Sequence, residues 1–293
     1  MIENADFLTG SIDLHIHVGP DYMPRYGDSV RLATEARNQG MKAIVIKQHL
    51  ASTVASAHLA NQIIEGIRVF GGISLNEPSG GFNLRNVLAA VKSGAKMIWL
   101  PTVDAEYAIK KAESGHWIKH YVHGSSFGYQ REGLNVLTSN KKLKDEVKEI
   151  VKICKESDVI LGSGHLGPEE CVVLAHESKK MGYGKLEITH PNAWLEDFDS
   201  GVLKELTKLG AWFTLSFGVC STQTGRQDIR EIANVIKEIG AEHCCLITDY
   251  GQVTNPSPVE GYRVFCQLLS TIGVSNEELD LMTKVNPSRL LSI

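Results

Sequence analysis

The sequence lacks any apolar run approaching the roughly 20 residues needed to cross a bilayer, and its N-terminus lacks the basic-then-apolar pattern of a secretory signal. It also lacks a basic cluster, and its net charge is −4, which argues against binding of nucleic acid or of an anionic membrane. These absences predict a cytoplasmic protein that acts on a small-molecule substrate. They leave the oligomeric state open, a homo-oligomer included.

The six cysteines are scattered and form no Cys-x-x-Cys pair. The sequence therefore has neither a zinc knuckle nor a thioredoxin-like motif, and we expect all six thiols to be reduced. No Gly-x-Gly-x-x-Gly segment follows the first apolar run, which argues against a doubly wound dinucleotide-binding sheet. No linker or low-complexity tract divides the chain, so we expect one domain over residues 1–293.

Eight short runs rich in β-branched residues alternate with longer amphipathic segments. Most runs begin about 25 to 30 residues apart, which is the length of one strand–helix unit. Eight such units with nearly continuous apolar strands predict an α/β protein whose parallel sheet closes into a single (β/α)8 TIM-type barrel, regular or distorted. The predicted strands are residues 12–17, 43–47, 68–75, 96–100, 159–162, 186–190, 211–216 and 244–249.

The exception to this spacing is a longer segment between the fourth and fifth runs. We expect residues 103–140 to form an active-site loop insertion, because the loops after barrel strands build the active site. Its histidines and aromatic residues are typical of a lid or a substrate wall. His116 and His120 are four positions apart and could share a metal ion if the segment is helical, although an ordinary amphipathic lid helix is the simpler interpretation.

The first run ends in His15 and His17, two imidazoles at positions i and i+2. Alternate residues of a strand share one face, so both side chains are expected to reach the same metal ion. By the same alternation, Leu14 and Ile16 are expected to face the packed outer layer.

Three further polar residues follow other predicted strands: His165 after the fifth, His190 at the end of the sixth and Asp249 at the end of the eighth. The carboxyl ends of barrel strands form one mouth, so these side chains should meet the histidine pair there. Each residue alone is a weak signal. Together the four histidines and the aspartate predict a metal centre.

The order of these residues resembles that of the amidohydrolase superfamily of metal-dependent barrel hydrolases, in an amidohydrolase-like branch. The tail Asn286-Pro287-Ser288-Arg289-Leu290-Leu291 is also similar to the closing Asn-Pro-Ala-x-x-Leu-Gly segment common there. The resemblance implies that His15, His17 and Asp249 hold one divalent ion, and that His165 and His190 complete that site or hold a second ion. Imidazole and carboxylate ligands suit zinc, with manganese, iron and nickel as alternatives.

The resemblance also implies a reaction, in which a divalent ion acidifies water and polarises a carbonyl group. The expected function is hydrolysis of a small polar substrate such as an amide, a lactone or a cyclic imide. Asp249 would accept the proton of the water and pass it to the leaving group. The candidate catalytic residues are Asp249, His190 and Lys47.

One departure from the resemblance concerns the number of ions. Binuclear relatives place a carbamylated lysine or a glutamate at the end of the fourth strand, and residues 97–102 contain neither. This favours one ion, unless Lys47 at the end of the second predicted strand bridges two. An unpaired buried lysine is costly, so Lys47 is also a candidate for binding a substrate anion or pairing with a carboxylate.

Other polar residues near the strand ends are candidates for contacting the substrate. Arg25, in the loop after the first strand, suits a carboxylate or a phosphate group. The full set of predicted substrate-binding residues is Arg25, Lys47, His49, Asn76, Thr102 and His120.

Three other functions stay open at this point. The protein could be a mononuclear decarboxylase or hydratase of an aromatic or keto acid, which would turn over such acids without hydrolysing esters or amides. It could be a phosphoesterase, although barrel-like phosphoesterases generally need more His and Asp ligands than this sequence offers. It could also be a barrel that keeps a metal for structure or ligand sensing, since fold does not determine function.

Overall fold

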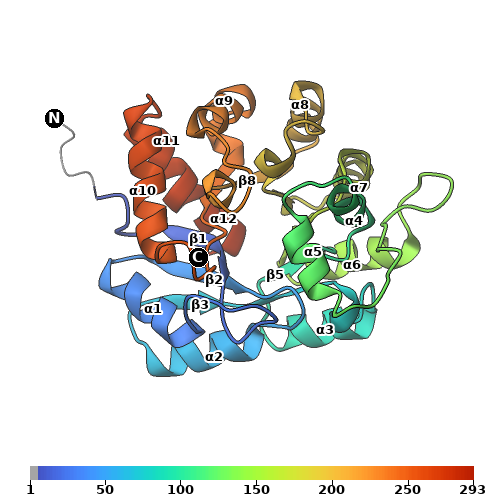
Figure 1. Ribbon diagram of the computed structural model, residues 1–293, viewed down its shortest axis with the longest axis horizontal. Helices are drawn as coiled ribbons and strands as arrows, with labels where there is room; N and C mark the ends of the chain where they lie inside the picture. The colour runs from blue at the N-terminus through green and yellow to red at the C-terminus, as the bar shows by residue number, and fades with distance from the viewer. Residues whose placement is uncertain (1–5) are drawn as a thin grey trace.

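The computed structural model describes residues 6–293, with short parallel strands at the centre and helices around them (Figure 1). The strands are β1 (Ile12–His17), β2 (Ala43–Lys47), β3 (Arg68–Phe70), β4 (Gly72–Ser74), β5 (Met97–Trp99), β6 (Ile160–Gly162), β7 (Leu186–Thr189), β8 (Trp212–Ser216) and β9 (Cys244–Ile247). The helices are α1 (Ser29–Asn38), α2 (Val54–Ile63), α3 (Leu84–Lys92), α4 (Glu106–Glu113), α5 (Lys119–Ser125), α6 (Asp145–Glu156), α7 (Pro168–Lys180), α8 (Ser200–Lys208), α9 (Ile229–Ile239), α10 (Pro258–Thr271), α11 (Asn276–Asp280) and α12 (Asn286–Leu291). Single 3-10 turns occur at Glu77–Ser79, Pro191–Trp194, Gly218–Cys220 and Ala241–His243, and a π-helical turn at Leu281–Val285.

The described strands form two parallel sheets, in the orders β1-β2-β3 and β4-β5-β6-β7-β8-β9. The α/β class and the parallel pairing are therefore confirmed, and each of the eight predicted runs contains a strand. The strand pairing among the described residues does not close into the predicted eight-stranded ring. The third run is divided into two strands, and each belongs to a different sheet. β3 pairs with β2, whereas β4 pairs with β5.

The division at Gly71 has a local cause. The backbone of Gly71 passes so close to Thr53 that a Cβ atom at this position would lie 2.7 Å from the Thr53 carbonyl carbon. The Thr53 N–H donates to the Gly72 carbonyl over 2.9 Å, and the Gly72 N–H donates to the Thr53 hydroxyl over 3.0 Å. Thr53 thus uses backbone groups that a neighbouring strand would otherwise pair, and the chain passes from one sheet to the other.

β1 lies beside the end of β9, although no ladder joins the two strands within residues 6–293. Two backbone hydrogen bonds connect them: the Asp249 N–H donates to the His15 carbonyl over 3.0 Å, and the His17 N–H donates to the Tyr250 carbonyl over 2.8 Å. These bonds hold the histidine pair against the aspartate that follows β9.

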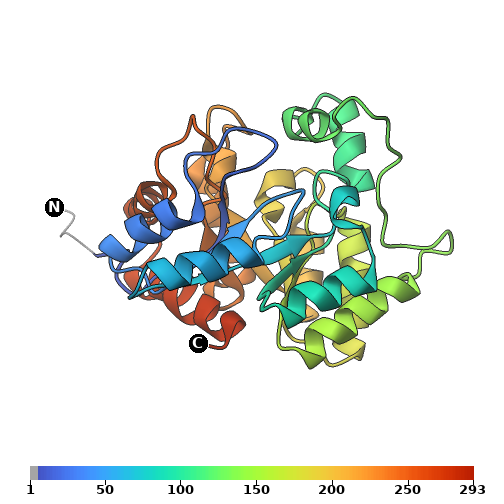
Figure 2. The same ribbon diagram turned by 90° about the horizontal axis from the view of Figure 1, so that it is seen from below.

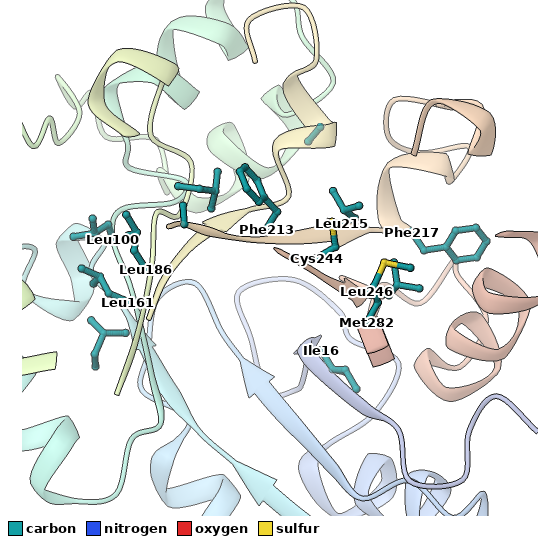
Figure 3. Packing of buried hydrophobic residues seen from close by; sticks show 14 of the residues in the cluster. Ile16, Leu100, Leu161, Leu186, Phe213, Leu215, Phe217, Cys244, Leu246 and Met282 are labelled. Atoms are coloured by element: carbon teal, nitrogen blue, oxygen red, sulfur yellow. The ribbon is translucent and has the colours of Figure 1, made fainter. Parts of the chain in front are cut away.

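Two apolar clusters stabilise this arrangement. The larger cluster lies between strands and helices, where Phe213 and Leu215 leave the same side of β8 (Figure 3). The fully buried members of the smaller cluster come from strands, apart from Leu290 and Leu291 of α12, and so it fills the space enclosed by the strands. Lys47 follows Val45 of this inner cluster at a spacing of two, which turns its side chain inward as well.

Leu14 corrects the expected alternation along β1. It belongs to the inner cluster with Ile12, not to the outer layer, whereas Ile16 faces outward as predicted. The register of β1 against β2 shifts between Asp13 and Ile16. The cause is Asp13, whose carboxylate accepts the N–H of His15 over 3.0 Å and so takes that group out of the strand pairing.

The predicted insertion contains α4, α5 and the loop that leads to α6, and it projects from one end of the molecule (Figure 2). α5 begins at Lys119, so His116 precedes it and the two imidazoles do not share one helix as a metal pair would require. The ring of His116 instead stacks on Trp194 at 4.9 Å between centroids. None of the described helices is both long and apolar enough to span a membrane. The one-domain expectation also covers residues 1–5, which lie outside the described residues.

Candidate metal centre

The side chains of His15, His17 and Asp249 meet at the carboxyl ends of β1 and β9. The Asp249 Oδ1 atom lies 3.2 Å from His15 Nε2 and 3.0 Å from His17 Nε2. Two donors that each lie 2.0–2.1 Å from a tetrahedral zinc ion are roughly 3.3 Å apart, so this spacing fits one shared cation. The three residues form a possible metal-binding group among the described residues, because their ligand atoms all lie within 4.8 Å of one another.

The backbone holds Asp249 in a specific position. Its φ is +56°, in the left-handed region that aspartate tolerates better than most residues. Gly251 allows the chain to pass directly over β1, because a Cβ at Gly251 would lie 2.1 Å from the His17 carbonyl oxygen. His190 also has a positive φ, +35°, immediately before Pro191. Such conformations are costly and concentrate at functional sites.

His165 and His190 lie next to this group. Their ring centroids are 5.0 Å apart, and the ring of His190 is 5.9 Å from that of His15. The Nδ1 atoms of both are buried without a hydrogen-bond partner in residues 6–293. The structure therefore brings all five predicted ligands to one place, with three of them closest together.

Burial keeps these imidazoles neutral. Desolvation holds the pKa of His15, His17 and His165 well below the usual value, and it lowers the pKa of His190 to about 4. A neutral imidazole presents a free nitrogen lone pair, which is the form that binds a metal ion. Unpartnered, neutral and convergent donors fit a divalent cation.

A small cavity opens beside the five predicted ligands, and His17, His165, His190 and Asp249 line it. The predicted insertion contributes Trp117, Ile118 and Tyr121 to its lining. The aromatic content of the insertion predicted a lid or a substrate wall, and this role stays a prediction. Gly218, Thr224 and Gln252 complete the lining, and no sequence signal marked them.

Lys47 is fully buried below the cavity. Its Nζ atom lies 5.0 Å from the centroid of the Trp99 ring and has no hydrogen-bond partner among the described residues. Burial lowers its pKa to about 8, against an opposing attraction to Asp249 and Glu187. Its predicted catalytic, substrate-binding or bridging role stays a prediction.

Two buried carboxyl groups that sequence reasoning missed lie beneath the site. Glu187 accepts a hydrogen bond from Thr189 over 2.6 Å, and Asp13 accepts one from Thr248 over 2.5 Å. Burial raises the pKa of each to about 7. A charged residue inside an apolar strand, as in Leu186–Thr189, was the available signal.

The remaining predicted substrate-binding residues differ in position. His49 lines the cavity. Asn76 and Thr102 are not part of its lining, and their side chains form hydrogen bonds with His49. Arg25 is buried and pairs with Asp21, its Nε donating to Asp21 Oδ2 over 2.8 Å.

His120 is exposed and lines a neighbouring pocket with Met23 and Pro24, not the cavity itself. The contact with substrate that we predicted for His120 therefore stays a prediction.

Comparison with known proteins places the chain in a family and gives its fold. The model of a protein family described as "Family of unknown function (DUF6282)" matches residues 10–214, and the chain belongs to this family. No curated protein matches the sequence.

Solved structures match over nearly the whole chain at low sequence identity. An amidohydrolase from Pseudomonas aeruginosa has a TM-score of 0.64 at 12% identity, covering 98% of this chain and 96% of its own. The organophosphorus hydrolase from Deinococcus radiodurans has a TM-score of 0.61 at 13% identity, covering 98% and 94%. A dipeptidase described as a metallopeptidase of family M19 has a TM-score of 0.54 at 14% identity, covering 94% and 71%. The predicted resemblance to the amidohydrolase superfamily is thus confirmed at the level of the fold.

Proposed function

We propose that this member of the DUF6282 family is a metal-dependent hydrolase that directs water onto the carbonyl group of a small polar substrate, an amide, a lactone or a cyclic imide. The observation that carries the proposal is the meeting of His15, His17 and Asp249 at the edge of a cavity that His165 and His190 also line. The proposal treats the chain as one domain, with the two sheets forming an interrupted (β/α)8 barrel.

A divalent cation would be held by His15 Nε2, His17 Nε2 and Asp249 Oδ1, and His165 and His190 would complete the site. Nitrogen and oxygen donors of this kind suit zinc first. A divalent cation there supplies Lewis acidity, which acidifies water and polarises a carbonyl group.

The second carboxylate oxygen of Asp249 is the proton carrier. Oδ2 lies 3.5 Å from the Ser216 hydroxyl and is not the atom that faces the two imidazoles. It can therefore accept a proton from the attacking water and return it to the leaving group. Trp117, Ile118 and Tyr121 would cover the bound substrate and exclude bulk water during this transfer.

The site is proposed to hold one cation. β5 is followed by Leu100, Pro101 and Thr102. None of these is the lysine or glutamate that bridges two ions at this position in binuclear relatives. A second cation would need another bridging ligand, and Lys47 is the candidate because its buried Nζ has no hydrogen-bond partner in the described part of the chain.

A second function, decarboxylation or hydration of an aromatic or keto acid, is favoured by a different observation. The cavity is also lined by Trp117 and Tyr121, whose aromatic rings suit a flat apolar substrate. A substrate panel separates the two functions, because only the hydrolase cleaves the acyl C–N bond of an amide or a cyclic imide, or the acyl C–O bond of a lactone.

The test is metal analysis combined with turnover. Protein purified without chelators should contain about one transition metal per chain, and Asp249→Asn, which removes a charged ligand, should lower metal affinity and abolish turnover. Asp145→Asn is the matched control, because the Asp145 side chain is 94% exposed on α6. Two ions per chain would implicate Lys47 as a bridge. No bound metal, even after incubation with zinc or manganese, would overturn the proposal.

A further inference from the structure

His49 forms part of the cavity wall and lies against His17, but it is not one of the three residues whose ligand atoms meet. It follows β2 and is 4% exposed, and its ring centroid lies 4.8 Å from that of His17 and 6.1 Å from that of His165. Its Nδ1 atom lies 2.9 Å from the Thr102 hydroxyl oxygen, so the opposite nitrogen, Nε2, is the one left for the cavity. Which of the two nitrogens carries the proton decides what His49 can do there.

The orientation of the Asn76 amide is determined by its surroundings. The Asn76 Oδ1 atom accepts the N–H of Thr102 over 2.8 Å and that of Asp104 over 3.1 Å. The Nδ2 atom donates to the His49 carbonyl and to the Thr102 hydroxyl, both over 2.7 Å. A flipped amide would set its N–H groups against two backbone donors and its oxygen against a carbonyl, so only one orientation is compatible.

The Thr102 hydroxyl then sets the proton on His49. Its oxygen already accepts a hydrogen bond from Asn76, and its own hydrogen needs an acceptor. Among the described residues the acceptor in reach is His49 Nδ1. Nδ1 must therefore be unprotonated, and the proton of the neutral ring lies on Nε2.

We propose that His49 is a built-in hydrogen-bond donor, which presents Nε2–H to an oxygen atom of the substrate beside the cation site. A protonated nitrogen has no lone pair for a metal, so His49 is not a ligand even though it lies against His17. The oxygen that it recognises belongs to a carbonyl group, and its negative charge grows as water adds to the carbon. A donor aimed at such an oxygen favours the transition state over the substrate.

In this assignment Asn76 and Thr102 are positioning residues. They were predicted to bind substrate, but both side chains are buried behind His49, and they act through it. The assignment of a reaction to His49 rests on the proposed hydrolase function. The position of its proton rests only on the hydrogen bonds within the chain.

The first experiment measures the proton directly, without turnover. Long-range 1H–15N spectra of 15N-histidine-labelled protein report which ring nitrogen is protonated, with His49 identified by loss of its signals in His49→Gln. We expect Nε2 to be protonated and Nδ1 bare, both without metal and after zinc loading. Thr102→Val should mix the two tautomers, and Thr102→Ser, which keeps the hydroxyl, should restore the wild-type pattern. A proton on Nδ1, or a zinc-induced shift that marks Nε2 as a ligand, would overturn the proposal.

The second experiment separates a donor from a ligand. His49→Leu should retain one zinc ion per chain, whereas His17→Ala should lose it. On a substrate found in the hydrolase panel, His49→Leu should lower kcat roughly 10²–10³-fold, and His49→Gln, which keeps an N–H donor, should recover part of this loss. Loss of zinc from His49→Leu would overturn the donor assignment. If the wild-type protein turns over nothing, the hydrolase proposal fails, while the tautomer and the zinc count still decide whether His49 is a donor.

Discussion

Replacing Lys47 with methionine is expected to stabilise the metal-free protein while it removes any turnover that needs the ammonium group. The Lys47 side chain is fully buried, and its Nζ has no hydrogen-bond partner within residues 6–293. The Nζ atom lies over the face of Trp99, 5.0 Å from the ring centroid. Methionine has a similar volume and no charge, so it can fill the same space without the desolvation cost.

The pKa of Lys47 gives the size of the effect. Burial lowers this pKa from 10.5 to about 8, and at 1.36 kcal/mol per pKa unit the difference amounts to about 3 kcal/mol. Because the folded pKa lies below the unfolded one, the unfolded chain binds more protons between these two values, and wild-type stability rises with pH there. The advantage of Lys47→Met should therefore be about 3 kcal/mol at pH 7 and should shrink as the pH rises from 8 toward 10.5.

The assay is urea unfolding of chelator-treated protein, followed by far-UV circular dichroism at about pH 7 and pH 9.5. Lys142→Met serves as the control, since Lys142 is exposed and the free energy of unfolding should change by less than about 0.5 kcal/mol. The reasoning is refuted if Lys47→Met is no more stable than wild type at pH 7. It is equally refuted if the difference between the two proteins is the same at both pH values.

Three further predictions follow from other buried groups. Burial raises the folded pKa of Glu187 from 4.5 to about 7, so wild-type stability falls as the pH rises between these values. In metal-free urea unfolding, the free energy of unfolding of Glu187→Gln relative to that of wild type should therefore be about 3 kcal/mol higher at pH 8 than at pH 5. In the same assay at pH 7, Arg131→Ala should lower the free energy of unfolding by about 3 kcal/mol, because it removes the cation that pairs with the buried carboxylate of Asp104. Asp104→Asn combined with Arg131→Ala should recover part of this loss. An unchanged unfolding midpoint for the single variant would contradict the ion pair. Zinc at 1,000 times its Kd should stabilise the chelator-treated wild type by about 4 kcal/mol and raise its Tm in a thermal melt. The Tm of His17→Ala should change little. Equal Tm shifts for both proteins would mean that zinc binds elsewhere.

The order of strands and helices was predictable from the sequence because the signals are local. Short apolar runs mark the strands, and β2, observed at Ala43–Lys47, has the bounds of the predicted run. The pair His15 and His17 could be interpreted as ligands for a similar reason. Once parallel strands are assumed, residues at their carboxyl ends must lie at the same edge, and so His165, His190 and Asp249 could be added from other strands.

The surroundings of the site could not be predicted in the same way. The aromatic content of the insertion marked a lid, but only the folded chain shows that Trp117 and Tyr121 line the cavity while His120 turns to a neighbouring pocket. The surroundings of Asn76 and Thr102 could not be predicted either, because a polar residue at a strand end can face the cavity or support a neighbour that does. Hydrogen-bond partners 26 or more positions away in the sequence make that choice.

Local sequence patterns were enough to predict the α/β class, the parallel strands and the residue types that gather at their carboxyl ends. Only the folded chain shows where the sheet divides and which way Leu14 points, and the tautomer proposed for His49 also depends on the fold. One cause is common to these three features. Strand and helix periodicity depends on near neighbours, whereas the break at Gly71, the shifted register at Asp13 and the proton on His49 depend on side-chain groups that compete for specific hydrogen bonds once the chain has folded.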